Sequence, residues 1–324
     1  MSEKVNKIAV LTSGGDAPGM NAAIRAVVRS AILSKIEVCG VIRGYNGLIN
    51  DEIVKMDSNS VSGIIQRGGT ALYTARCKEF ETLEGQKKAR DICKKHNIDA
   101  LVVIGGDGSF KGAQAISRLS IPCICIPGTI DNDIASTSYT IGYDTAMNTA
   151  MEMVDKLRDT AQSHDRCTVV EVMGRHAGYL ALNVGISCGA TSILIPEVQF
   201  DFQKDIVEEI IIGKNSGKKH FIIIVAEGVK GKDTLAQRIE DGTGIETRLT
   251  VLGHVQRGGA PTARDRIVAS IMGEHAVQLL KNNKINRVVS VQNDDVTDYG
   301  FEEAFSMKKK LDTRLYKVAH DISI

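Results

Sequence analysis

Short apolar runs alternate along this chain with segments of helical periodicity, and several of the runs end in a glycine-rich turn. Residues 7–12, 101–104 and 121–126 are runs of this kind. Runs without polar alternation are typical of buried parallel strands, and strands that alternate with helices connect by right-handed crossovers. The pattern therefore predicts an α/β fold with mostly parallel sheets, whose ligands bind at the carboxyl ends of the strands.

Length and composition exclude several classes of function. The 324 residues suffice for two domains or one large α/β domain, and the formal net charge of +1 gives no field that attracts nucleic acid or membrane. No apolar run approaches the ~20 residues of a membrane helix, and the N-terminus lacks a signal peptide's apolar region. Seven cysteines is an odd number, and Cys39, Cys93, Cys123 and Cys125 lie in apolar or helical runs. We therefore expect reduced thiols and a cytoplasmic protein.

The stretch 127–133, PGTIDND, directly follows the apolar run 121–126. It places the hydroxyl of Thr129 and the carboxylates of Asp131 and Asp133 at the end of a predicted strand. Acidic groups in that position are candidates for proton abstraction or metal binding. Taken alone, the stretch is also compatible with a surface turn, since Asn and Asp favour such turns.

Two glycine turns of one type follow predicted strands, SGGD at 13–16 and GGDGS at 105–109. Consecutive backbone N–H groups at such a turn, beside the positive end of a helix, form an anion site. The first turn is neither a Walker A loop nor a convincing dinucleotide fingerprint. In the second turn Asp107 is placed to hold Mg²⁺ against phosphates, Gly108 leaves space for the anion, and Ser109 is expected to cap the following helix. Tight packing of strand against helix is the structural alternative.

The second half supplies basic groups at the ends of predicted strands, beside glycines. Guanidinium groups match the oxygens of a sugar phosphate, and Glu227 suits the hydroxyls of a sugar. The residues of this set are Arg166, Arg175, Glu227, Arg248, His254 and Arg257. Kinase chemistry needs two anion sites, a metal and a carboxylate near the attacking hydroxyl, and the chain supplies a candidate for each.

Apolar periodicity assigns the remaining elements. Asp144 is expected as the N-cap of a long helix. Helices are expected over 21–33, 61–67, 83–96, 202–212 and 262–280, and strands over 37–43, 167–172, 191–195, 220–226, 246–252 and 288–291.

Five motifs together resemble the bacterial 6-phosphofructokinase family: TSGGDAPGMN, GGDGS, PGTIDND, EVMGRHAG and ETRLTVLGHVQRGG, spread from residue 8 to at least 272. The resemblance implies phosphoryl transfer from MgATP to the 1-hydroxyl of D-fructose 6-phosphate, the committed step of glycolysis. It implies a cytoplasmic homotetramer of two Rossmann-like three-layer domains with the active site in the cleft between them. A larger ATP-binding domain is expected at 1–142 plus 254–304, and a smaller sugar-phosphate domain at 143–253 plus 305–324.

The same resemblance assigns catalytic roles by motif. Asp131 is the expected general base for the sugar 1-hydroxyl, and Thr129 is expected to contact the transferring phosphoryl group. Asp133 supports the base and the surroundings of the metal, while Arg76 neutralises charge in the transition state and Arg175 assists. The residues implied for ATP are Gly15, Arg76, Cys77, Gly106, Asp107, Gly108 and Ser109, with Asp107 on Mg²⁺.

For the sugar phosphate, the resemblance implies a set drawn from both halves of the chain. Arg166 and Arg248 are expected to reach across from a neighbouring subunit. The others are Thr129, Ile130, Asp131, Met173, Gly174, Arg175, Glu227, His254 and Arg257.

Three alternative functions account for fewer of these residues. A pyrophosphate-dependent relative usually carries Asp where Gly108 stands and Lys where Gly128 stands, so the two glycines favour ATP. NAD and lipid kinases share GGDG but leave PGTIDND and GHVQRGG unexplained. A non-catalytic nucleotide sensor has no need of both Asp107 and Asp131.

The effector site that the resemblance implies, for ADP or phosphoenolpyruvate between subunits, matches only in part. Its basic residues are Arg25, Arg29, Arg158, Lys218 and Lys219. Ser58 stands where a basic residue is common, Gly63 where an Asp helps to hold the effector's Mg²⁺, and Thr191 where a Glu responds to the sign of the effector. Our hypothesis is a basic cleft that discriminates poorly between the two effectors.

Overall fold

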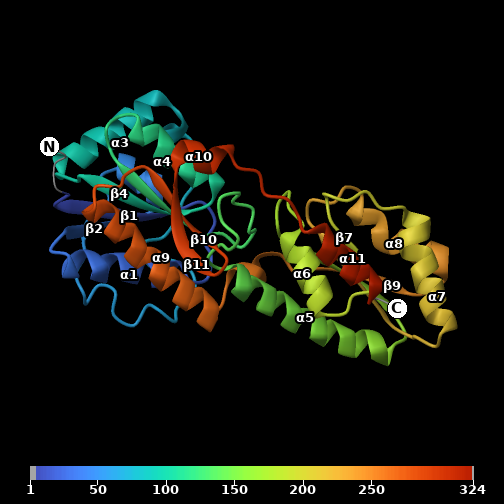
Figure 1. The fold of residues 1–324 in the computed structure, drawn as a ribbon. Helices are drawn as coiled ribbons and strands as arrows, with labels where there is room; N and C mark the ends of the chain where they lie inside the picture. Colours follow the sequence, from blue (N-terminus) through green and yellow to red (C-terminus); the bar gives the residue numbers. More distant parts are fainter. Residues whose placement is uncertain (1–4, 323–324) are drawn as a thin grey trace. The chain divides into compact units, whose positions relative to one another are not determined.

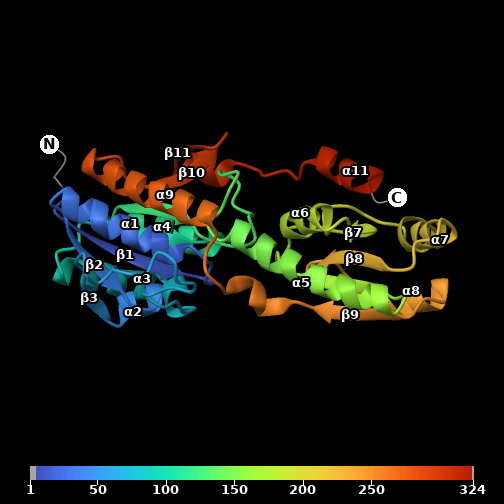
Figure 2. The same ribbon diagram turned by 90° about the horizontal axis from the view of Figure 1, so that it is seen from below.

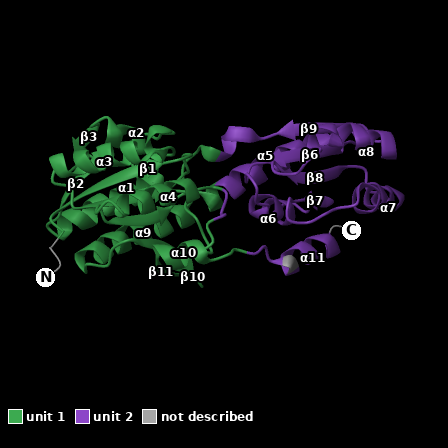
Figure 3. Cartoon of the chain, turned by 90° about the horizontal axis from the view of Figure 1, so that it is seen from above, with its two compact units in different colours: residues 1–130, 134–145, 257–309 green, residues 131–133, 146–256, 310–324 purple. Residues whose placement is uncertain are grey.

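The computed structural model describes residues 5–322, which form two compact units (Figure 3). The first unit runs to Ile130 and also contains Ile134–Thr145 and Arg257–Lys309. The second contains Asp131–Asp133, Ala146–Gln256 and the chain from Lys310 onward. Each unit is therefore built from several separate stretches of the sequence.

A seven-stranded sheet of order β11-β10-β5-β4-β1-β2-β3 forms the centre of the first unit (Figure 1). Its five inner strands are parallel, and the two edge strands, β3 and β11, are antiparallel to their neighbours. The bounds are β1 (Lys7–Ser13), β2 (Glu37–Val41), β3 (Ile53–Lys55), β4 (Ala100–Gly105), β5 (Cys123–Pro127), β10 (Arg287–Gln292) and β11 (Asp295–Gly300).

Helices cover both faces of this sheet, because alternate side chains of each buried strand point to opposite faces. Ala9 and Leu11 of β1 lie in one buried core, which also takes side chains from α2 (Gly44–Ile49), α3 (Leu83–Lys95), α4 (Asp107–Ser117) and α10 (Phe301–Ser306). Figure 2 shows α1 (Met20–Leu33) and α9 (Ala263–Lys281) side by side on the face away from α2 and α3. The first unit is therefore a three-layer sandwich.

The second unit has a four-stranded, fully parallel sheet of order β7-β8-β6-β9. Its strands are β6 (Cys167–Val172), β7 (Ser192–Leu194), β8 (Phe221–Ala226) and β9 (Thr247–Val251). Its helices are α5 (Tyr143–Ser163), α6 (Tyr179–Ser187), a π-helical segment η2 (Gln203–Glu208) that leads into α7 (Glu209–Asn215), α8 (Leu235–Thr243) and α11 (Thr313–Asp321). Short 3₁₀ turns occur at η1 (Glu79–Glu81) in the first unit, at η3 (Lys232–Thr234) in the second, and at η4 (Gly253–Arg257), where the chain passes from the second unit to the first. Within residues 5–322, no helix is long and apolar enough to cross a membrane.

The predicted α/β fold with mostly parallel sheets is confirmed, and so are most of the predicted strands and helices. The helix expected over 61–67 is wrong. This stretch forms successive turns instead, in which Ser62 N–H donates to Asn59 O and Arg67 N–H to Ile64 O. Gly63 has φ +64°, a left-handed conformation that ends any right-handed helix at that point.

Several elements lie outside the expected set, among them the short helices α8, α10 and α11. The glycine-containing segment GYNGL, residues 44–48, forms most of helix α2, and Gly47 is glycine because a Cβ there would lie 1.6 Å from Ile42 O. The antiparallel edge strands β3 and β11 were not expected. Asn293 and Asp294 join β10 to β11 with φ +51° and +67°, the pair of positive φ values that a two-residue type I′ hairpin requires.

Two helix caps are also corrected. α5 begins at Tyr143, so Asp144 lies in its first turn and not at the N-cap. α4 begins at Asp107 with Gly106 at the N-cap, which places Ser109 inside the first turn, where it is buried. In both cases a glycine before the helix, Gly142 or Gly106, takes the place of the expected cap.

Asp298 of β11 supports the first unit from the edge of its sheet. Its carboxylate accepts hydrogen bonds from Arg287 and, at 3.1 Å, from His275 Nε2. Burial works to raise the pKa of Asp298, but the bonds from Arg287 and His275 outweigh it, so the pKa lies below its usual range. A carboxyl of this kind stabilises the fold above its ordinary pKa, and loses that contribution as pH falls through the depressed value.

We expect Asp298→Asn to lower the free energy of unfolding at pH 7 by ~1–3 kcal/mol, because a charge-assisted pair becomes a neutral one. Thermal unfolding of the wild type and the variant between pH 7 and pH 3 measures this. The two Tm values should draw closer as pH falls below the ordinary carboxyl range, because the wild type loses the contribution of the ionised Asp298 as pH approaches its depressed pKa. A Tm difference that stays constant across this pH range would show that the ionised carboxylate is not the stabilising species.

Candidate active site

Three glycine-containing turns lie next to one another at the carboxyl ends of the central strands in the first unit. The strands β1, β4 and β5 are neighbours, and the register pairs Ser13 with Gly105 and Gly105 with Pro127. Gly128 N–H donates to Gly105 O at 2.9 Å, and a Cβ on Gly106 would lie 3.8 Å from Thr129 Cβ. The predicted anion turns and the start of PGTIDND therefore lie side by side.

The first turn of α4 lies at the carboxyl end of β4. Asp107 has a half-exposed side chain, at 49%, and its carboxylate pairs with Lys111 Nζ at 2.7 Å. Gly108 is exposed, and a Cβ built there meets no atom within 4 Å. Backbone N–H groups at a helix N-terminus attract anions, so this turn is suited to a phosphate.

The segment with Arg76 and Cys77 is tied to the first glycine turn. Thr74 Oγ1 donates to Gly14 O at 2.7 Å, and Thr12 Oγ1 donates to Tyr73 O at 2.8 Å. Arg76 is exposed and Cys77 partly buried. The sequence therefore brings its predicted ATP residues together within the first unit.

Asn21, which the sequence reading did not select, orders the start of this segment. Its side-chain amide donates to Arg67 O at 3.0 Å and to Gly68 O at 3.2 Å, and its Oδ1 accepts from Ala71 N–H at 2.6 Å. Asn21 is the last residue of TSGGDAPGMN, so its position in that motif was the available signal.

Arg257 lies in the first unit, against the first glycine turn. Its Nη1 donates to Asp16 O at 3.1 Å, and a Cβ on Gly15 would lie 2.6 Å from the same nitrogen. Glycine at position 15 therefore permits the guanidinium to approach the backbone. Most of the other residues expected on the sugar phosphate, Arg175 and Glu227 among them, belong to the second unit.

The loop after β5 folds back on itself around Thr129. Thr129 N–H donates to Ile141 O at 3.1 Å, and Thr140 Oγ1 donates to Thr129 O at 2.6 Å. Gly128 is packed closely, since a Cβ would lie 3.1 Å from Ile104 and 3.2 Å from Met20. Ile130 is buried, as is Asp131, whose exposure is 3%.

Asp131 and Asp133 are grouped with the second unit. Asp133 lies close enough to Tyr179 for its charge to act on the phenol. Burial first, then the negative charges of Glu197 and Asp133, raise the pKa of Tyr179. Asn132, between the two acids, has φ +50°, which a short polar residue tolerates.

In the second unit, Arg175 and Glu227 lie together at the carboxyl ends of β6 and β8. The register pairs Val172 with Ala226, and Arg175 N–H donates to Glu227 Oε1 at 2.5 Å. Arg175 has φ +55° and an exposed position. The main chain thus projects the guanidinium outward while Glu227 holds its backbone.

Gln256 is a further residue that the sequence reading missed. It is fully buried, its Oε1 accepts from Met173 N–H at 3.3 Å, and its Nε2 donates to Gly253 O at 2.9 Å. It therefore links the Met173–Gly174 turn to η4, which carries the exposed His254.

Arg166 and Arg248 lie at the opposite end of the same sheet. Glu246 holds both, accepting from Arg166 Nε at 2.7 Å and from Arg248 Nη2 at 2.5 Å. The hydrogen bond from Arg166, opposed by burial and reinforced by Arg248, lowers the pKa of Glu246. Arg166 directly precedes β6 and Arg175 follows it, and a six-residue strand is about 20 Å long. Within one chain, the structure does not bring these two arginines to Arg175.

The expected effector residues fall in both units. In the second unit, burial and then the charge of Arg158 lower the pKa of Lys218, and burial, Arg158 and Lys218 lower that of His220. Arg158 also donates to Cys188 O. These three residues form a basic cluster, of which His220 was not anticipated. Lys219 is exposed, while Arg25 and Arg29 lie on α1 in the first unit.

The three positions that depart from the expected effector pattern differ in setting. Ser58 and Gly63 are exposed residues of the turns before β4. Thr191 is 5% exposed at the start of β7, and its Oγ1 has no hydrogen-bond partner in the described part of the chain. No effector-binding role for these three residues follows from their geometry.

The donor set for a metal is small. Among residues 5–322, no group of three or more His, Cys, Asp or Glu side chains converges as a metal cage. A single carboxylate beside an anion site, as at Asp107, fits a Mg²⁺ ion that arrives with phosphate oxygens, since Mg²⁺ is usually bound through one or two carboxylates and its substrate.

Comparison with known proteins agrees with this geometry. The phosphofructokinase family model matches residues 7–280. ATP-dependent 6-phosphofructokinases of Clostridium botulinum and Clostridium tetani are both 55% identical to the chain, over 98% of its length and 99% and 100% of theirs. The phosphofructokinase structure from Saccharomyces cerevisiae superposes with a TM-score of 0.87 at 36% identity, over 99% of this chain and 48% of the yeast chain. The chain is a member of the phosphofructokinase family.

Proposed function

We propose that this chain is an ATP-dependent 6-phosphofructokinase. It transfers the terminal phosphoryl group of MgATP to the 1-hydroxyl of D-fructose 6-phosphate, giving fructose 1,6-bisphosphate and ADP. The observation that carries the proposal is that the turns with Gly15, Asp107 and Thr129 lie side by side at the carboxyl ends of β1, β4 and β5. The 55% identity to proteins named for this activity supports it.

ATP binds the first unit, on the ATP-binding domain expected at 1–142 plus 254–304. The main-chain N–H groups of Gly15 and Gly106–Ser109 face the phosphates, and Arg76 and Cys77 flank them. Asp107 holds Mg²⁺, which supplies neutralisation of phosphate charge. Gly108 keeps the approach to α4 open, in line with the free space around it.

Fructose 6-phosphate binds the smaller domain, 143–253 plus 305–324, through Arg175, Glu227 and the Met173–Gly174 turn, with His254 and Arg257 on its phosphate. Arg166 and Arg248 come from a neighbouring subunit of a homotetramer. The length of β6 supports this assignment, because it keeps both arginines away from Arg175 of their own chain.

Asp131 is the general base, positioned by a loop that holds Thr129 at both its N–H and its carbonyl. The carboxylate takes the proton of the sugar 1-hydroxyl as that oxygen attacks phosphorus. Thr129 binds the transferring group, Arg76 and Arg175 stabilise the negative charge that develops, and Asp133 supports the surroundings of the base and the metal. The cytoplasm suits this reaction and the seven free thiols.

A coupled assay that compares ATP with pyrophosphate on fructose 6-phosphate tests the proposed function. We expect turnover with ATP and little with pyrophosphate, because glycine occupies positions 108 and 128. Preference for pyrophosphate would assign the chain to the alternative donor. Nucleotide binding without turnover would make it a sensor.

Effector control is expected to be weak. The basic cluster of Arg158, Lys218 and His220 suits an anion, but Gly63 and Thr191 offer no carboxylate that separates ADP from phosphoenolpyruvate. Allosteric coupling is ordinarily ~1–3 kcal/mol, and the loss of these contacts removes most of it. Initial rates against fructose 6-phosphate, with and without each effector, measure the coupling. Strong and opposite responses to ADP and phosphoenolpyruvate would contradict this expectation.

A further inference from the structure

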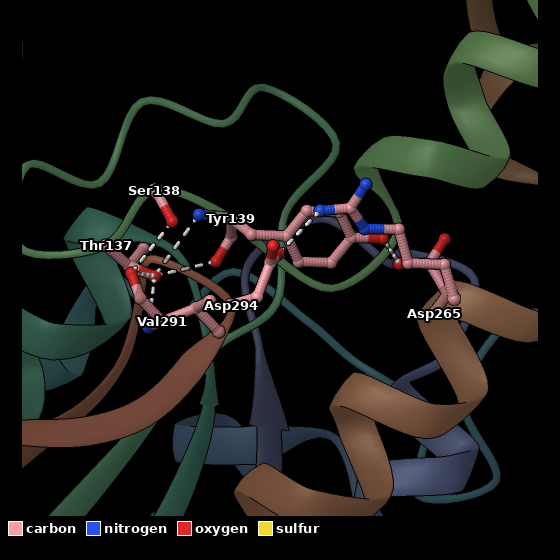
Figure 4. Close-up of polar contacts among 7 residues, drawn as sticks. Thr137, Ser138, Tyr139, Asp265, Val291 and Asp294 are labelled. Carbon is pink, nitrogen blue, oxygen red and sulfur yellow. Dashed lines mark hydrogen bonds and ion pairs between the residues drawn. The ribbon is translucent and has the colours of Figure 1, made fainter.

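Asp265 is a fully buried carboxylate near the start of α9 that the proposed mechanism does not use. It accepts four hydrogen bonds. Oδ1 takes the Tyr139 hydroxyl at 2.5 Å and Gly142 N–H at 2.7 Å, and Oδ2 takes Thr145 N–H at 2.9 Å and Thr145 Oγ1 at 2.5 Å. Figure 4 shows the carboxylate directed at the Tyr139 hydroxyl.

The carboxylate is not needed to cap its own helix. Thr262 is the N-cap of α9, and its Oγ1 accepts the Asp265 N–H at 3.3 Å. Thr262 N–H in turn donates to Thr145 Oγ1 at 3.0 Å, so both residues connect α9 to the start of α5. All four bonds of the Asp265 side chain therefore go to one other segment, residues 139–145.

That segment is the second half of the loop that carries Thr129. Ile141 N–H donates to Pro127 O at 2.9 Å, Thr129 N–H donates to Ile141 O, and Thr140 Oγ1 donates to Thr129 O. A displacement of Gly142 is therefore passed through Ile141 and Thr140 to both backbone groups of Thr129, and Asp131 is two residues further along the chain.

The loop is also held from β10, but at its outer part. Ser138 N–H donates to Val291 O at 2.9 Å, and Val291 N–H donates to Thr137 Oγ1 at 2.8 Å (Figure 4). Arg264 stacks on Tyr139, 4.8 Å from the ring centre. The contacts from β10 hold Thr137 and Ser138, whereas Asp265 holds the stretch that bonds directly to Thr129.

We propose that Asp265 is a positioning residue for catalysis, which fixes the loop 128–145 from α9 and thereby sets the place of Thr129 and of the base Asp131. The inference rests on the proposed function. Burial raises the pKa of Asp265 against the opposing effect of its four donors, so the fold maintains a costly buried carboxyl at this position.

The variant Asp265→Asn keeps the shape of the side chain and removes one of its two acceptor oxygens. Hydroxyls of Tyr139 and Thr145 can turn to accept from the new amide, but backbone N–H groups cannot. Either Gly142 N–H or Thr145 N–H therefore faces a donor. We expect kcat to fall by about 10–100-fold, the usual effect of a reacting group displaced by about 1 Å, while KM for ATP changes little.

Asp298→Asn is the matched control. It also neutralises a largely buried carboxylate in the first unit, but its hydrogen-bond partners are Arg287 and His275, which lie outside the loop 128–145. It should lower Tm and leave kcat unchanged. Hydrogen exchange should become faster over 128–145 in Asp265→Asn and stay at the wild-type rate there in Asp298→Asn.

A double-mutant cycle separates positioning from general stability. If Asp265 acts through the base, Asp265→Asn should cost little further turnover in an Asp131→Ser background, because coupled residues are not additive. Tyr139→Phe removes one donor and keeps the ring, and should give a smaller change in kcat and exchange of the same direction. If Asp265→Asn does not fold, the kcat and exchange rates of Tyr139→Phe test the inference instead.

Unchanged exchange over 128–145 together with wild-type kcat would overturn the inference and leave Asp265 as a purely stabilising group. If the effects of Asp265→Asn and Asp131→Ser on kcat are fully additive, Asp265 does not act through Asp131. If the wild type fails to phosphorylate fructose 6-phosphate, the proposed function fails on its own, and the exchange comparison still decides whether Asp265 holds the loop.

Discussion

Asp131→Ser is expected to lower kcat by about 10²–10⁴-fold with a modest change in KM for fructose 6-phosphate, the usual weight of general-base catalysis. Serine cannot take the proton of the 1-hydroxyl, so the attacking oxygen must lose it to solvent. Ground-state binding is retained because the arginines of the second unit remain.

Steady-state kinetics with both substrates varied separately give the two constants. Asp159→Ser on α5 is the control, because it removes an exposed carboxylate that no step of the mechanism requires. Near-normal turnover of Asp131→Ser would contradict the assignment of Asp131 as the general base, whatever variants of the other site residues do. A loss confined to KM would make Asp131 a binding residue.

Gly108→Asp is expected to lower kcat/KM for ATP by about 10²-fold, since juxtaposed like charges cost several kcal/mol. The new carboxylate would stand beside Asp107 at the mouth of the phosphate turn. The fold should accept it, because a Cβ at this position meets no atom within 4 Å.

Gly108→Ala separates charge from volume and should stay close to the wild type with ATP. The same pair of variants assayed with pyrophosphate shows whether the lost ATP activity is matched by a gain with the smaller donor. Equal ATP kinetics of the Asp and Ala variants would remove Gly108 as a donor-selecting residue. Gly128 is a poorer test position, because a side chain there meets Ile104 and Met20.

The strands and the turns after them could be predicted because their signals are local. A buried parallel strand is an apolar run, and Gly14 and Gly106 stand directly after β1 and β4. The start of α5 depends on a distant group: α5 begins at Tyr143, and Asp265, more than a hundred residues later, holds Gly142. The error at α2 has a local origin, because the segment is rich in glycine and Gly47 is glycine only because a Cβ there would meet Ile42 O.

The sequence proposes residue types for the candidate site but does not indicate which residues hold them in place. Glu246 and Gln256 hold expected site residues, the first through the side chains of Arg166 and Arg248 and the second through Met173 N–H. Asn21 and Asp265 instead hold the neighbouring segments 67–71 and 139–145. Nothing in local composition separates such residues from ordinary polar ones. Only Glu246 could have been identified from spacing, because it stands two residues before Arg248, whose side chain it holds.

The interleaving of the two units in the sequence has a consequence for synthesis of the chain. β5 is paired on its outer side by β10, whose residues follow the long stretch Ala146–Gln256 of the second unit in the sequence. While the ribosome makes residues 146–256, β5 is an open parallel edge, the kind of surface that pairs with other chains. Asp265 and β10 arrive together after this interval, so closure of the sheet and ordering of the Thr129 loop are late events of biosynthesis.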